Sequence, residues 1–260
     1  MERVPDGSTP PDPVGSVPTV VGRHRLPTDV IGELVSVLAD APPLVVCDLT
    51  GMAPPVPRTA DLFAPVAAYL ADWPGTHVVV CVPDPQAYAA TVPPTVAERL
   101  LVHATREEGL ADALERVTPV EHAVTHLAPV VTAARDARAF TTRALLDWRL
   151  ASLIGPAGVV VSELVTNSIV HAVTVLDLTL SRTDTCLRIA VHDRGGGSPS
   201  VNTRGAPGEM LNGRGLVLVR ALAKGWGVFQ SRSSKGKTVW AVMDISALAP
   251  RPVRGSRAHS

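Results

Sequence analysis

Apolar residues follow two different periods along the chain, and the changes between them divide the sequence into helices and strands. Short continuous apolar runs indicate buried strands, whereas apolar residues three and four positions apart indicate amphipathic helices. In the first part of the chain, strands are expected at 43–49, 78–82 and 100–103, and helices at 28–38, at 59–73 and from the capping box at 105–108 onward. Strands that alternate with helices through residues 28–117 predict a small α/β domain.

The second part of the chain has a different order of elements. Helical spacing runs from Val131 to Leu150, and a central helix begins at Gly155-Pro156, where proline suits the first helical position. A hairpin, a short helix closed by Gly225 and two final strands follow, at 173–180 and 186–192, at 216–224, and at 227–231 and 237–245. Residues 131–247 are therefore expected to form a second α/β domain, and residues 118–130 a linker.

The two ends of the chain and its composition narrow the class of protein. Residues 1–27 are rich in proline, glycine and serine, so we expect a disordered leader there and a disordered tail at 248–260. The formal net charge is +0 and no concentrated basic run precedes the tail, which argues against direct nucleic-acid binding. Three cysteines in apolar runs indicate reduced, buried thiols, and no apolar run approaches the length of a membrane span. A cytoplasmic protein without membrane contact is expected.

The stretch SELVTNSIVHA at 162–172 carries the first candidate chemistry. Its apolar positions recur at helical spacing, so one face should be buried, and Glu163 and Asn167 lie four residues apart on another face. A carboxylate and a carboxamide stacked in this way can hold a divalent metal ion and supply a general base. The alternative is an amphipathic helix on which both side chains are simply solvated. We expect His171, one turn further on, to be structural.

A glycine-rich stretch follows the expected hairpin. Asp193 stands at the end of a strand, where its carboxylate can accept a hydrogen bond from an exocyclic amine. Gly195 and Gly197 let the backbone approach a ligand closely, although an ordinary glycine loop has the same composition. The irregular stretch 194–212 is long for a compact domain and is expected to be a lid or disordered.

Two further motifs lie near the end of the chain. Gly213-Arg214-Gly215-Leu216 opens a helix, where backbone N–H groups and the helix dipole favour a phosphate. It is not a Walker-type loop, because no Gly-Lys-Ser/Thr ends it. Thr238, in Gly236-Lys237-Thr238, offers a hydroxyl group at the start of the last strand. Each motif alone is weak evidence, since a helix start and a hairpin turn need the same residues.

The order of these motifs is more specific than any one of them. Glu163 and Asn167, then Asp193-x-Gly195-x-Gly197, then Gly213-x-Gly215, then Gly236-Lys237-Thr238 resemble the GHKL (Bergerat-fold) ATP-binding superfamily. The wording SELVTNSIVHA, HDRGGG, GRGLVLV and GKTVWA looks most like the anti-sigma-factor serine kinase branch. The resemblance covers roughly residues 131–245. It implies a Bergerat-type α/β sandwich with helices on one face of a mixed, largely antiparallel sheet.

The resemblance also implies roles for individual residues. Asn167 would coordinate the Mg²⁺ that bridges the ATP phosphates, and Glu163 would be the general base. Asp193 would bind the adenine amine. The remaining positions would complete the nucleotide site: Gly195 and Gly197 at the base, Gly213, Arg214, Gly215 and Leu216 at the phosphates, and Thr238 on the adenine side. Phosphoryl transfer needs these positioned donors more than covalent chemistry by the protein.

The first half resembles a STAS domain, the fold of anti-sigma-factor antagonists, more loosely. The matching piece is the strand and loop VVCDLTGM at 45–52. In antagonists, a serine of the following loop is phosphorylated, but the corresponding position here is Pro57, which has no acceptor oxygen. The nearest hydroxyl, Thr59, is expected to cap a helix. This half is therefore interpreted as a degenerate module for partner docking or homodimer formation.

Two functions from different classes remain open at this stage. The first is an ATP-dependent serine/threonine protein kinase that phosphorylates a regulatory partner, an anti-sigma-factor antagonist or sigma factor by resemblance. The second is a nucleotide-dependent binding switch without catalysis. Glu163 favours the kinase, because a pure binder needs no base, whereas the absent acceptor in the first half favours the switch. A sensor histidine kinase is disfavoured, since no long paired-helix hairpin surrounds His122 and His126.

Overall fold

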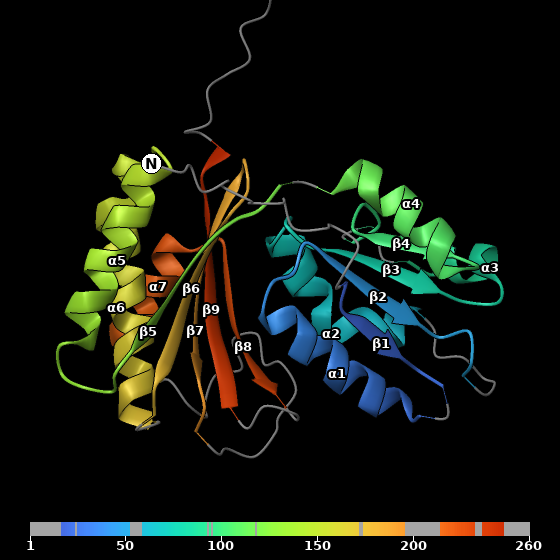
Figure 1. The fold of residues 1–260 in the computed structure, drawn as a ribbon, viewed down its shortest axis with the longest axis horizontal. Coiled ribbons are helices and arrows are strands. Elements are labelled where there is room, and N and C mark those ends of the chain that lie inside the picture. Colours follow the sequence, from blue (N-terminus) through green and yellow to red (C-terminus); the bar gives the residue numbers. More distant parts are fainter. Residues whose placement is uncertain are drawn as a thin grey trace, which may run out of the picture.

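The computed structural model describes residues 17–23, 25–52, 59–92, 94, 96–117, 119–171, 174–195, 214–231 and 236–246. Two layered α/β halves lie side by side, each built on its own sheet (Figure 1). The expected tail at 248–260 and most of the expected leader lie outside the described residues, as do Gly197, Pro57 and Gly213.

The first half is a parallel sheet with helices on both faces. Its strands are β1 (Thr19–Val21), β2 (Leu44–Asp48), β3 (His77–Cys81) and β4 (Leu100–His103), in the order β1-β2-β3-β4. Its helices are α1 (Pro27–Ala39), α2 (Thr59–Asp72), α3 (Pro85–Ala89) and α4 (Arg106–Arg116). Because both faces are covered, β2 and β3 are continuous apolar runs, as the sequence predicted. The likeness to STAS domains stays a prediction.

The expected leader is wrong in its last third. Residues Thr19–Val21 form β1, which pairs in parallel with β2 and places Val20 in the core. Three residues are too few to show a period, and the surrounding prolines favour disorder by composition alone. Pairing with an already buried neighbouring strand decides the conformation here.

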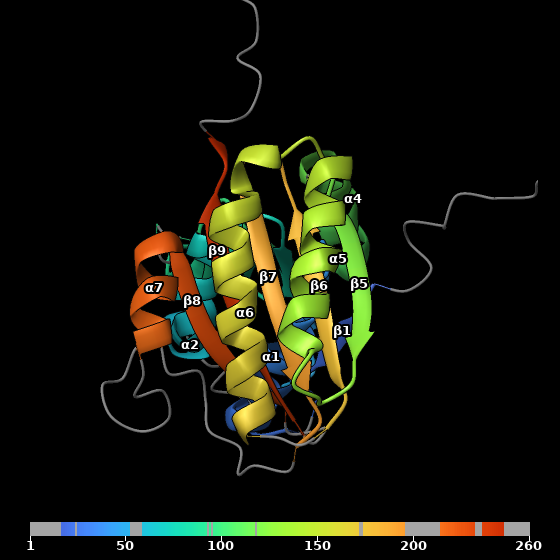
Figure 2. The same ribbon diagram turned by 90° about the vertical axis from the view of Figure 1, so that its left-hand side faces the viewer.

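The second half is a five-stranded sheet in the order β5-β6-β7-β9-β8, and every described pair in it is antiparallel. Its strands are β5 (Glu121–Leu127), β6 (Leu176–Arg182), β7 (Cys186–Asp193), β8 (Gly225–Ser231) and β9 (Gly236–Asp244). Its helices are α5 (Ala133–Asp147), α6 (Ile154–His171), which a short 3-10 turn at Ala151–Leu153 precedes, and α7 (Arg214–Leu222). Figure 2 shows α5, α6 and α7 side by side across one face of this sheet. The two-domain α/β class is confirmed, although the sheet is not mixed.

Two local predictions in this half are wrong. Residues 118–130 were expected as a linker, but 121–127 form the edge strand β5, paired residue by residue with β6. Only alternate positions of β5 face the core. The polar residues His122 and His126 lie at the intervening positions, so the segment lacks the apolar run that predicted the other strands. Gly225 does not close a helix. It begins β8, where a Cβ atom would lie 2.2 Å from the Asp72 carboxylate.

Both faces of the second sheet are buried, against different partners. Residues such as Val191 and Val239 join the core with α5 and α6, whereas their neighbours Ala190 and Trp240 join the core of the first half. Helices α1 and α2 of the first half lie against this reverse face (Figure 1). The two halves therefore share one hydrophobic core.

Aromatic rings and a buried arginine form the centre of this shared core. The Tyr69 ring of α2 lies edge-on to Phe229 and Trp240, with ring centroids 5.0 and 5.2 Å apart. The fully buried guanidinium of Arg188 donates a 2.7 Å hydrogen bond to the carbonyl of Ala39 at the end of α1. It also lies 5.8 Å from the centre of the Tyr69 ring. Burial lowers the pKa of Arg188, which is held between the halves by one hydrogen bond and one ring.

One described helix is long and apolar enough to cross a membrane by length and composition. It covers Ala151–Val170, which is mostly α6, and it corrects the expectation that no apolar run has this length. Its apolar residues include Val161, Leu164 and Val165, which are fully buried against α5 and the second sheet. A core helix passes the same test, so this finding is weak evidence for a membrane span.

Candidate functional site

Asp193 ends β7 as a buried carboxylate with unused hydrogen-bonding capacity. It is 1% exposed, and its Oδ1 atom accepts a 3.3 Å hydrogen bond from the amide of Gly195. Its Oδ2 atom has no hydrogen-bond partner among the described residues. The Lys237 ammonium lies 3.9 Å from Oδ2, close enough for an ion pair but beyond hydrogen-bonding distance. A buried acceptor left without a partner is costly, which is typical of a site that binds a donor.

The electrostatics of Asp193 combine two opposing effects. Burial raises the pKa of its carboxyl above the usual 3.8. The Lys237 ammonium, followed by the amide of Gly195, opposes that rise by stabilising the charged form. The carboxylate is thus balanced between a dry environment and a nearby cation.

The two candidate residues of α6 lie on one flank of that helix. The fully buried residues Val161, Leu164 and Val165 define its core-facing stripe. Ser162 accepts a 2.9 Å hydrogen bond from Arg138 of α5, so its flank faces α5. Because residues follow every 100°, Asn167 lies about 140° from Ser162, across the buried stripe.

Asn167 and Glu163 therefore lie on the flank away from α5, on the side of α7, since α6 lies between the two helices (Figure 2). Both side chains are half-buried, and neither has a hydrogen-bond partner among the described residues. Within the described part of the chain, these contacts are the same for a solvated side chain and for one that binds a ligand.

The chain path brings Asp193 and the start of α7 to the same end of the sheet. Asp193 pairs with Lys237 at the beginning of β9, and β8 ends beside it, where Ser231 pairs with Gly236. Two residues separate α7 from the beginning of β8, so the helix ends at the far end of that strand. Because the chain reverses direction between α7 and β8, the start of α7 at Arg214 lies toward the end of the sheet that carries Asp193.

The end of α6 reaches the same edge. Residue Leu176, which begins β6 shortly after α6, pairs with Asp193, and the amide of Arg194 donates a 3.2 Å hydrogen bond to the Thr174 hydroxyl. The structure thus places Asp193, the start of α7 and the C-terminal half of α6 at one end of the helix-covered face. Of the predicted phosphate residues, Arg214, Gly215 and Leu216 belong to the first turn of α7.

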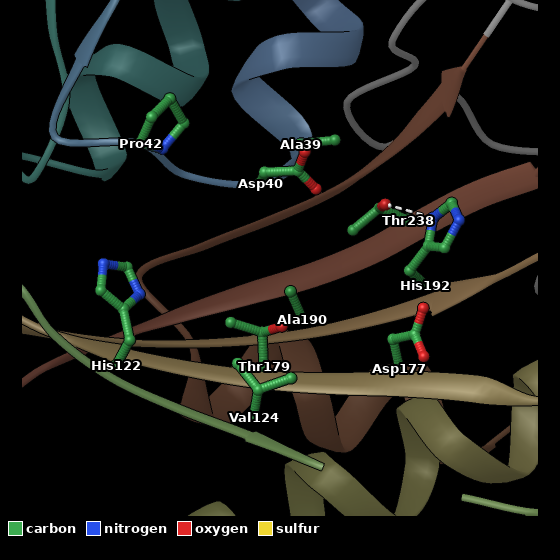
Figure 3. Close-up of a pocket in the computed structure, with 10 residues that line it drawn as sticks. All are labelled: Ala39, Asp40, Pro42, His122, Val124, Asp177, Thr179, Ala190, His192 and Thr238. Atoms are coloured by element: carbon green, nitrogen blue, oxygen red, sulfur yellow. Dashed lines mark hydrogen bonds between the residues drawn. The ribbon is translucent and has the colours of Figure 1, made fainter. Parts of the chain in front are cut away.

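Thr238 is not brought to this end of the helix-covered face. Paired residues of neighbouring strands share a face, and Thr238 pairs with His192 on the reverse side of the sheet. Its hydroxyl lies 3.0 Å from Nδ1 of His192 (Figure 3). The residue that shares a face with Asp193 is Lys237, which sequence reasoning passed over. The alternation from Val239 back to Lys237 was the signal that could have found it.

The reverse face carries a pocket of its own, of about 320 Å³ (Figure 3). It lies between the end of α1 and the second sheet, and its lining residues are Ala39, Asp40, Pro42, His122, Val124, Asp177, Thr179, Ala190, His192 and Thr238. Burial raises the pKa of Asp40, while His192 and Arg188 oppose the rise. This pocket does not include Asp193 or α6, so it is separate from the candidate site.

Comparison with known proteins decides what kind of domain carries this arrangement. Residues 123–243 match the family described as the histidine kinase-like ATPase domain. This part of the chain is therefore similar to histidine kinase-like ATPase domains, and it is called the ATPase domain below. The match includes α6, Asp193 and most of β5 and β9, and it confirms the GHKL-type resemblance of the second half. No curated protein matches the sequence.

A solved structure gives a more distant likeness. The RsbU and RsbW domains of Rv1364c from Mycobacterium tuberculosis match at 18% identity and a TM-score of 0.33, over 53% of this chain and 39% of that one. The match therefore spans less than half the length of that solved chain.

The residues of the ATPase domain fit the groups that such a domain uses. The Oδ2 atom of Asp193, which accepts no hydrogen bond from the described part of the chain, suits an amine donor, and the start of α7 suits an anion. Among the described residues, no group of three His, Cys, Asp or Glu side chains forms a metal cage. Mg²⁺ commonly takes one or two protein oxygens and completes its shell with phosphates and water, so the oxygen of Asn167 is a suitable ligand.

Proposed function

We propose that this protein is an ATP-binding regulator of the anti-sigma-factor serine/threonine kinase type, cytoplasmic and acting on a partner protein. The observation that supports this most is the buried Asp193 oxygen of the ATPase domain, which has no hydrogen-bond partner among the described residues and lies at the same end of the sheet as the start of α7. An amine of adenine satisfies that oxygen, and the phosphates then extend toward the first turn of α7.

The chain's own residues supply positioning and proton transfer. Asn167 and Glu163 lie one helical turn apart on the α7 side of α6, so a metal ligand and a base face the same phosphates. Mg²⁺, when bound through Asn167, neutralises charge on the phosphates. A partner's hydroxyl oxygen forms the new bond to the γ-phosphorus while the bond to the ADP oxygen breaks, and Glu163 accepts the hydroxyl proton. The products are ADP and a phosphorylated serine or threonine.

The partner chemistry follows from the lack of an acceptor in this chain's own first half. The corresponding loop position is Pro57, and α1 and α2 are packed against the reverse face of the ATPase sheet. We infer that the acceptor hydroxyl belongs to a separate protein, an antagonist-like regulator that approaches the Glu163 side.

A non-catalytic switch is the second candidate, and the shared core favours it. Because Trp240 and Phe229 of the ATPase sheet pack on Tyr69, a nucleotide-driven shift of β8 and β9 would move the first half directly. In this case ATP and ADP would set which partner binds, and Glu163 would have no role in turnover.

One experiment separates the two candidates. The wild type, Glu163→Gln and a control, Glu121→Gln on the edge strand β5, are incubated with Mg-ATP and antagonist-like protein, and ADP and phosphoprotein are measured. The kinase predicts that Glu163→Gln binds ATP normally but forms phosphoprotein roughly a hundredfold or more slowly, within the usual range for losing a general base. Equal phosphoprotein formation by all three proteins would remove Glu163 as the base. ATP binding without turnover by the wild type would favour the switch.

A further inference from the structure

The residue that faces Asp193 across the strand pair is a lysine with no hydrogen-bond partner among the described residues. Lys237 and Asp193 are directly paired in the β7–β9 register, so both side chains lie on the helix-covered face. The Lys237 side chain is 17% exposed and Asp193 is 1% exposed. A mostly buried lysine is uncommon unless it is paired.

The ion pair between Lys237 and Asp193 is too long for a hydrogen bond, so both side chains can still form hydrogen bonds with a ligand. Its Nζ to Oδ2 distance of 3.9 Å exceeds the 2.7–3.2 Å typical of a hydrogen bond. The side chain of Lys237 is long and flexible and its ammonium has three donors, whereas Asp193 offers only acceptors. A donor group and an acceptor group thus lie side by side on the same face of the sheet, and no hydrogen bond joins them.

We propose that Lys237 is a second base-reading residue, whose ammonium donates to the ring nitrogen N1 of adenine while Asp193 accepts from the adjacent 6-amino group. This inference rests on the proposed ATP site. Adenine presents an amine donor beside a ring-nitrogen acceptor, which matches an aspartate beside a lysine. Guanine presents the reverse order along the same edge, a carbonyl acceptor beside an N–H donor. In the same pose, guanine sets its oxygen against Asp193 and its N–H against Lys237, so the pair discriminates against it.

A lysine that only neutralises Asp193 is the competing explanation, and one atom of the ligand distinguishes the two roles. In the 1-deaza analogue of ATP, a C–H group replaces N1 and removes the acceptor while the 6-amino group remains. If Lys237 only neutralises the charge of Asp193, this replacement should not change nucleotide affinity. A hydrogen bond from Lys237 to N1 is lost with it.

The test is a titration of four proteins with Mg-ATP, Mg-1-deaza-ATP and Mg-GTP. The proteins are the wild type, Lys237→Met, which keeps the length but has no donor, Lys237→Arg, which restores a donor, and the control Lys224→Met at an exposed lysine between α7 and β8. Thermal unfolding of each variant checks that it is folded.

The wild type and Lys224→Met should bind ATP about ten- to a hundredfold more tightly than 1-deaza-ATP, the usual range for a hydrogen bond to a charged group. Lys237→Met should bind both equally, at the weaker affinity, and Lys237→Arg should recover part of the preference. Wild-type protein that binds ATP and 1-deaza-ATP equally overturns the role of Lys237 but leaves the ATP site intact. A Lys237→Met variant that keeps the full preference has the same consequence. Wild-type protein that binds none of the three nucleotides overturns both proposals.

Discussion

The aromatic contact between the two halves gives the sharpest prediction about stability. Tyr69 is fully buried, belongs to α2 of the first half, and contacts Phe229 and Trp240 of the ATPase sheet at centroid distances of 5.0 and 5.2 Å. Replacing Tyr69 with Ala removes the ring from a site enclosed by elements of both halves. Because the surrounding strands are fixed in a sheet, the cavity cannot collapse fully.

The expected loss is about 3–5 kcal/mol of unfolding free energy, as for other buried aromatic residues replaced by alanine. For a chain of this size, that corresponds to roughly 6–20 °C in melting temperature. Differential scanning calorimetry of the wild type, Tyr69→Ala and the control Leu114→Ala, whose side chain is half exposed on α4, measures the effect. A shared core predicts one transition that moves as a whole in Tyr69→Ala and stays in place in Leu114→Ala. Two separate transitions, of which only one moves, would refute the shared core.

Three further predictions concern individual charged or titratable groups. The unfolding free energy of Arg188→Met should stay within about 2 kcal/mol of the wild type, because the lost hydrogen bond to Ala39 is offset by removal of a buried guanidinium. Arg188→Ala should lose roughly 2–5 kcal/mol, because it leaves a cavity. Equal losses for the two variants in denaturant titrations would contradict this account. Burial, assisted by Arg188, lowers the pKa of His122 below 6.5. The neutral imidazole therefore contributes to folding stability above pH 6.5, and this contribution is lost as the pH falls toward the folded-state pKa. His122→Asn should flatten the dependence of melting temperature on pH in that range, and an unchanged profile would contradict this role of His122. Burial also raises the pKa of Asp193, and its charged form is the stronger acceptor for an adenine amine. ATP affinity should therefore fall with decreasing pH beginning above pH 3.8, and a flat profile down to that pH would contradict the role of Asp193.

The sequence predicts most elements of the ATPase domain well because their apolar segments are long. Helix α6 carries many apolar residues at helical spacing, and strand β7 is a mostly apolar run, so both elements can be located from their own residues. The short strand β1 and the edge strand β5 escape the same reasoning. Each gains its conformation by pairing with a buried neighbour, and that gain is not visible in its own residues.

The sequence names candidate residues for the site but does not predict on which face of the sheet each one lies. Asp193 and the start of α7 lie toward the same end of the sheet, whereas Thr238 faces the first half and Lys237 lies beside Asp193. In a strand, a shift of one residue moves a side chain to the opposite face, so a sequence motif alone does not determine which side chain contacts the ligand.

The shared core was missed for a related reason. Strand β9 is apolar at consecutive positions from Val239 to Val242, and a strand with that pattern is buried on both faces. The pattern predicts a second layer behind the sheet but does not say what supplies it. Only the structure shows that the layer is α1 and α2 of the same chain.

The central claim is that the ATPase domain binds Mg-ATP at the Asp193 end of its sheet, and a calorimetric titration tests it most directly. The wild type, Asp193→Ala, Asn167→Ala and the control Thr238→Val are titrated with ATP, with and without Mg²⁺. The account predicts that the wild type binds ATP more tightly with Mg²⁺, that Asp193→Ala loses binding about tenfold or more, and that Asn167→Ala loses the Mg²⁺ dependence. Thr238→Val, on the reverse face, should bind nearly as the wild type does. Wild-type protein that binds no ATP, or binding that both site variants leave unchanged, would contradict the account.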